Sequence, residues 1–62
     1  MNSVKQYYQE VTKEIKNLYI AICNEINRTS VFDSTRLLYL FNNKSRLENE
    51  LYALELKVEE MD

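Results

Sequence analysis

The chain has 62 residues, a net charge of −2, and no Gly, Pro or His. An ordinary domain of this length carries roughly four Gly and three Pro, so their absence argues against tight hairpins, sandwiches and glycine-rich phosphate loops. The commonest general acid–base residue is missing, and the negative charge argues against electrostatic binding of nucleic acid by the whole chain. We therefore expect long helices in one small domain, residues 1–62.

The composition also predicts a non-enzymatic, cytoplasmic protein. The single cysteine, Cys23, excludes an internal disulfide framework and a metal site made of Cys alone. No run of 18 apolar residues predicts a membrane span, and no basic-then-apolar leader opens the chain. We predict no catalytic residue, no metal and no cofactor. The abundance of Asn, Lys, Ile and Tyr is typical of AT-rich coding DNA, which favours a low-GC bacterium, or its phage or mobile element, as the source.

The first predicted helix covers about residues 3–27. Its apolar residues follow one another in alternating steps of four and three, the pattern of a helix that packs along one stripe. The stripe consists of Val4, Tyr8, Val11, Ile15, Leu18 and Ile22, and Ile26 extends it. Residues 27–30 have the weakest helical character in the chain, so we predict a turn over about 28–33.

The second predicted helix covers about residues 34–61. Asp33 is a candidate N-cap, either alone or with Ser30 in a capping box. The apolar stripe of this helix consists of Leu37, Leu40, Lys44, Leu47, Leu51, Leu54, Val58 and Met61, in which only Lys44 is not apolar. Lys44 has two interpretations. Its amine lies over Leu18 and reaches Glu14, or it selects the register or the oligomeric state.

The two stripes match each other as an antiparallel hairpin centred on residue 31. In every pair the two position numbers add up to 62. The pairs are Met1 with Met61, Val4 with Val58, Tyr8 with Leu54, Val11 with Leu51, Ile15 with Leu47, Leu18 with Lys44, and Ile22 with Leu40. The same pairs can form within one chain or between two chains of a swapped dimer. We predict an all-α fold, an antiparallel, coiled-coil-like two-helix hairpin that dimerises into a four-helix bundle.

Apolar residues outside the stripes gather near the predicted turn, and a contiguous apolar patch usually marks an interface. The predicted protein interface consists of Tyr19, Ile20, Cys23, Ile26, Phe32, Leu38, Tyr39 and Phe41. Its occupant is a second copy of the chain, a larger protein or both, and a monomer that tolerates the patch is the remaining alternative. We therefore expect a protein that acts through contacts, as a regulator, an inhibitor or an assembly subunit.

Nucleic-acid binding is the alternative function. Arg28, Arg36, Lys44 and Arg46 surround the middle and the turn end, with several Asn residues between them. Arg and Asn side chains contact phosphates and base edges. In size and stripe pattern the chain resembles plasmid copy-control RNA-binding hairpins of the Rop type, a likeness of architecture without a shared residue motif. Some short helical hairpins are aspartyl-phosphate phosphatases with a Ser-Gln-Glu-Leu-Asp signature, but residues 40–44 read Leu-Phe-Asn-Asn-Lys. Catalysis by Asn42 or Asn43 on a phosphoryl group remains a third hypothesis.

Overall fold

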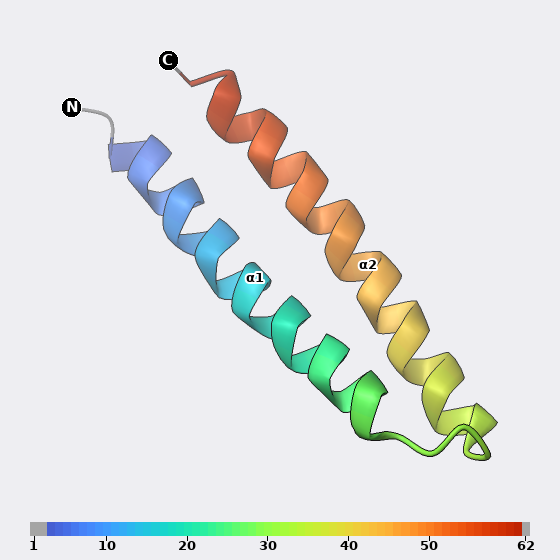
Figure 1. The fold of residues 1–62 in the computed structure, drawn as a ribbon. Coiled ribbons are helices and arrows are strands. Elements are labelled where there is room, and N and C mark those ends of the chain that lie inside the picture. Colours follow the sequence, from blue (N-terminus) through green and yellow to red (C-terminus); the bar gives the residue numbers. More distant parts are fainter. Residues whose placement is uncertain (1–2, 62) are drawn as a thin grey trace.

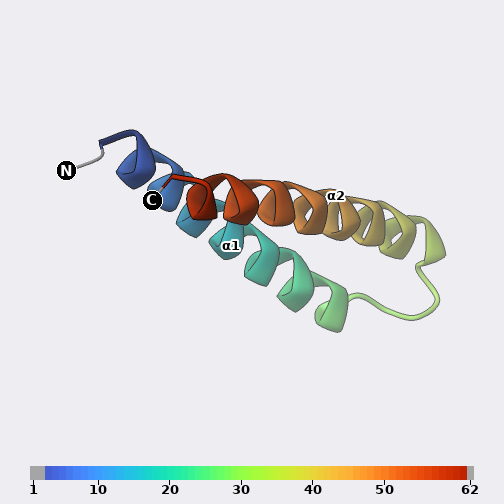
Figure 2. The same ribbon diagram turned by 90° about the horizontal axis from the view of Figure 1, so that it is seen from above.

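Residues 3–61 are described by a computed structural model, which consists of two antiparallel helices joined by a short turn. Helix α1 spans Ser3–Arg28 and helix α2 spans Ser34–Glu59, with 26 residues each. The helices lie side by side, with the start of α1 and the end of α2 at the same end of the molecule (Figure 1). The view from above shows that their axes are inclined to each other (Figure 2). The predicted all-helical hairpin is confirmed, and it forms within a single chain.

The turn is held by hydrogen bonds between side-chain oxygens and backbone groups, and it contains no glycine. The Thr29 hydroxyl donates a 2.7 Å hydrogen bond to the Glu25 carbonyl at the end of α1. Asp33 is the N-cap of α2, as predicted, and its carboxylate accepts a 3.1 Å hydrogen bond from the Arg36 backbone N–H. The Ser30 hydroxyl oxygen accepts from the Phe32 backbone N–H at 3.2 Å. No described residue has a positive φ, so this turn needs no Gly.

Helix α2 packs through the stripe that the sequence predicts. Leu40 is 1% exposed and Leu47 is 7% exposed, which makes them the only buried apolar residues in the described part of the chain. The other stripe residues are partly buried: Leu37, Lys44, Leu51, Leu54, Val58 and Met61. Asn43, which the stripe does not include, is also partly buried. The predicted partner of Met61, Met1, lies outside the described residues.

Helix α1 faces its partner differently from the prediction. Val4 and Leu18 were expected in the contact, but they are 53% and 54% exposed. The more buried positions are Tyr8, Val11, Thr12, Ile15, Tyr19, Ile22, Cys23 and Ile26. The helix is therefore turned so that Thr12 and Tyr19 approach α2. Thr12 tolerates burial because its hydroxyl donates a 2.7 Å hydrogen bond to the Tyr8 carbonyl.

The molecule is one layer of helices thick. Its principal extents are 50 × 15 × 10 Å, and its radius of gyration is 14.6 Å. A compact domain of this length has a radius of gyration of about 10.6 Å. Because stable domains usually bury the apolar faces of two layers against each other, this hairpin leaves apolar helix surface uncovered.

Candidate interaction surface

A polar cluster joins the two helices near their middle. The Tyr19 hydroxyl on α1 donates a 3.0 Å hydrogen bond to the Glu48 carboxylate on α2. The Lys44 ammonium binds the same carboxylate oxygen at 3.1 Å and lies 5.7 Å from the centre of the Tyr19 ring. The predicted contacts of Lys44 with Leu18 and Glu14 are thus replaced by contacts with Tyr19 and Glu48. Lys44 therefore pairs with Tyr19, the residue that follows its predicted partner Leu18.

The three groups of this cluster shift one another's proton affinity. The hydrogen bond from Lys44, followed by that from Tyr19, lowers the pKa of the Glu48 carboxyl below its usual 4.5. Donation to Glu48 is the main cause that raises the pKa of Tyr19 above 10.0, and it also raises the pKa of Lys44 above 10.5. Tyr19 and Lys44 are partly buried and Glu48 is exposed, so the cluster links the helices at the surface without forming a sheltered reaction site.

The residues of the predicted protein interface do not all lie on one face. Tyr19, Cys23 and Ile26 are partly buried against α2, whereas Ile20, Phe32, Leu38, Tyr39 and Phe41 are exposed. Phe32 is the most exposed, at 94%. Tyr39 and Phe41 are two residues apart, which places them on nearly opposite sides of α2. Tyr39 instead lies next to Arg36, whose guanidinium carbon is 5.6 Å from the centre of its ring.

Helix periodicity identifies the predicted residues that share a side of the hairpin. The Lys16 ammonium and the Glu55 carboxylate meet at 3.6 Å, so both helices turn these positions toward one side. Cys23 follows Lys16 by seven residues, and Phe41 precedes Glu55 by fourteen, so both lie on that side too. Ile20 and Leu38 each stand three residues before Cys23 and Phe41, on neighbouring surface. Ile20, Cys23, Leu38 and Phe41 form what we call the turn-end surface.

The cations predicted to contact nucleic acid are mostly engaged within the chain. Arg28 pairs with Glu25 at 4.0 Å, Arg36 stacks over Tyr39, and Lys44 pairs with Glu48. Arg46 is exposed on α2. Three of the four cations therefore already have a partner side chain within the chain.

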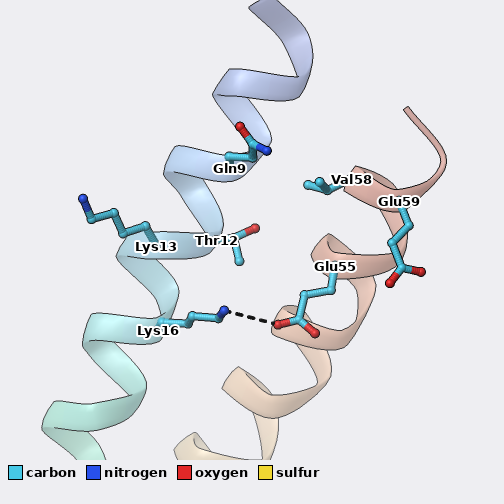
Figure 3. Close-up of a pocket in the computed structure, with 7 residues that line it drawn as sticks. All are labelled: Gln9, Thr12, Lys13, Lys16, Glu55, Val58 and Glu59. Carbon is cyan, nitrogen blue, oxygen red and sulfur yellow. Dashed lines mark ion pairs between the residues drawn. The ribbon is translucent and has the colours of Figure 1, made fainter. Parts of the chain in front are cut away.

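An open groove lies at the end of the hairpin that is far from the turn, between α1 and α2 (Figure 3). Its volume is about 480 Å³, and its lining consists of Gln9, Thr12, Lys13, Lys16, Glu55, Val58 and Glu59. The ion pair between Lys16 and Glu55 spans it (Figure 3). Cations and carboxylates are both present, and the one buried hydroxyl, that of Thr12, already donates to the backbone. The groove thus offers no preference for a ligand of either charge.

The sequence does not predict the bond between Tyr19 and Glu48, although it does indicate the ion pair beside it. Lys44 and Glu48 are four residues apart on one helix, the spacing at which opposite charges pair.

In the described part of the chain, no three His, Cys, Asp or Glu side chains are placed to hold a metal ion. No helix in residues 3–61 is long and apolar enough to cross a membrane. Comparisons of the chain with protein families, with curated proteins and with solved structures found no match.

Proposed function

We propose that this chain is a non-enzymatic contact protein that works as a dimer of hairpins in a four-helix bundle. Its role is that of a regulator, an inhibitor or an assembly subunit of a larger protein. The observation that carries the proposal is the distribution of apolar residues. Two apolar residues are buried in the described chain, whereas eleven large ones are exposed. A chain of this size rarely stays folded on so small a core.

The exposed area supports a partner of about the same size. The chain exposes 4945 Å² of surface. A compact monomer of 7.5 kDa exposes about 4,200 Å², so the excess is about 700 Å². Each partner of a standard protein–protein interface buries about 800 Å². Covering one face of the hairpin with a second hairpin accounts for an area of this size.

The turn-end surface supports a contact with a larger protein. Phe41 and Leu38 on α2 and Ile20 on α1 are exposed, Cys23 is partly buried, and Phe32 stands exposed in the turn. Clustered aromatic and aliphatic side chains that no part of the chain covers are the usual anchors of a protein interface. In contrast, the internal partners of Arg28, Arg36 and Lys44 give the nucleic-acid alternative no added support.

Sedimentation over a range of protein concentrations tests the dimer. We expect the mass of two chains at micromolar concentration, and a urea midpoint that rises with protein concentration, because association stabilises the folded state by mass action. A folded chain that sediments as a monomer throughout would contradict the dimer.

Phe41→Glu tests the turn-end surface. We expect this variant to remain folded and dimeric but to lose the proteins that the wild-type chain captures from its own cell. Tyr52→Glu is the matched control, because Tyr52 is an exposed aromatic residue on the same helix near the other end of the hairpin. Equal capture by both variants would remove the turn-end surface from the proposal.

A further inference from the structure

A line of apolar residues on α1 lies along one edge of its contact with α2. Val4, Val11 and Leu18 are spaced by seven residues, so they lie on one side of the helix over about 21 Å. Val4 and Leu18 are exposed, and Val11 is partly buried. The sequence pattern predicts burial for all three, but in the structure Thr12 and Tyr19 are turned further toward α2 than Val4 and Leu18 are. We call Val4, Val11 and Leu18 the α1 strip.

The α1 strip and the turn-end surface lie on opposite faces of the hairpin. Leu18 is two residues from Lys16, a separation that places them on nearly opposite sides of α1. Lys16 lies on the face of the ion pair with Glu55, which is also the face of the turn-end surface. One hairpin can therefore bind a partner along the α1 strip and leave Phe41 uncovered.

We propose that the α1 strip is the contact between two copies of this chain, with the two α1 helices antiparallel across a two-fold axis at Val11. This inference rests on the proposed dimer and specifies its interface. The strip is self-complementary, since Val4 and Leu18 each lie seven residues from Val11. A two-fold axis at Val11 therefore places Val4 of each copy opposite Leu18 of the other.

Charge and area favour a second copy in this orientation. The strip has no charged member, and its heptad continuation toward the turn is Glu25, which is paired with Arg28. Antiparallel packing separates the two copies of Glu14, three residues beyond Val11, by about 9 Å along the helix, whereas parallel packing places them side by side. Antiparallel packing also points the dipoles of the two α1 helices in opposite directions, which is the favourable arrangement. The excess exposed surface of the whole hairpin, about 700 Å², is close to what one partner of a standard dimer buries.

Crosslinking through single cysteines tests the arrangement, with Cys23→Ala as the background in the full chain. We expect Val11→Cys to oxidise to a covalent dimer, because the two copies meet at the axis. We expect Leu18→Cys alone to stay uncrosslinked, since its two copies are about 21 Å apart along the helix. A mixture of Val4→Cys and Leu18→Cys chains should form the mixed disulfide. A Leu18→Cys homodimer without the mixed disulfide overturns the antiparallel arrangement.

Leu18→Glu and Leu38→Glu form a matched pair of exposed leucines on opposite faces. We expect Leu18→Glu to raise the dimer dissociation constant by at least about 30-fold, the effect of losing an interface hot spot, while Leu38→Glu leaves it within about threefold. A dimer that persists in Leu18→Glu and gives no Val11→Cys crosslink overturns the strip but leaves the proposed dimer standing. A wild-type chain that is monomeric at every concentration overturns both.

Discussion

Tyr19 on α1 and Glu48 on α2 are joined by a hydrogen bond of 3.0 Å, which is a direct side-chain link between the helices. The bond accompanies a rotation of α1 from its predicted orientation, in which Tyr19 rather than Leu18 approaches α2. A phenol at position 19 reaches the carboxylate and the Lys44 ammonium of α2, contacts that the neighbouring Leu18 side chain cannot make. Leu18 is therefore left on the outer side, where it becomes part of the α1 strip.

Tyr19→Phe should lower the urea midpoint of unfolding, because it removes the donor of this bond and keeps the ring. The loss should be smaller than that of a core deletion, because the bond is exposed to water. The measurement is urea denaturation at fixed protein concentration, with Tyr52→Phe as the control. Glu48→Gln in both backgrounds completes a double-mutant cycle, and strictly additive losses would show that the two residues are not coupled.

Stability should depend on pH at both ends of the range. The pKa of Glu48 is lowered in the folded state, so its contribution is present above the usual pKa of 4.5 and disappears as the pH falls below it. The pKa values of Tyr19 and Lys44 are raised, so their contributions are present below about pH 10 and disappear as the pH rises through the raised values.

Urea midpoints measured from pH 3 to pH 11 should therefore show a plateau between the two declines. Comparison of the wild-type chain with Glu48→Gln isolates this cluster from the other ionisable groups. We expect the variant to lose less stability than the wild type at both extremes. Parallel pH profiles for the two proteins would contradict a role for the cluster.

Leu40→Ala should nearly abolish folding of the hairpin. Leu40 is the most buried side chain in the described chain, and deletion of a buried leucine costs about 2–5 kcal/mol. A domain of this size rarely has more than about 3–5 kcal/mol of stability. Circular dichroism against urea measures the loss. Leu38→Ala is the control, because Leu38 is 63% exposed and its truncation should change stability by about 0.5 kcal/mol or less.

Asp33→Ala should destabilise the start of α2 by about 1 kcal/mol, since it removes the acceptor for the Arg36 backbone N–H. Asp33→Asn should retain most of the stability, because asparagine caps a helix about as well as aspartate. Thermal unfolding monitored by circular dichroism distinguishes the two variants. Equal stability of Asp33→Ala and Asp33→Asn would show that the cap contributes nothing.

The predictable part of the fold was the part held by strong local signals. The spacing of Leu40 and Leu47 within a leucine-rich stripe oriented α2 correctly, because large aliphatic side chains recur there at every turn of one face. Asp33 was recognised as a cap because its side chain acts on a backbone group three residues away. The candidate surface was harder to predict. Tyr39 and Phe41 were grouped by proximity in sequence, although helix geometry separates them.

Two helices that fold back near Val31 could be predicted from the sequence, because these features follow from periodicity, capping and the weak helical stretch between them. The side of α1 that meets α2 could be found only from the packed structure. Leu18 and Tyr19 were both possible contacts by hydrophobicity, and in the structure Tyr19 is the one that bonds to Glu48 in the other helix. A pattern within one helix cannot report such a bond, because its energy depends on where the second helix places its acceptor.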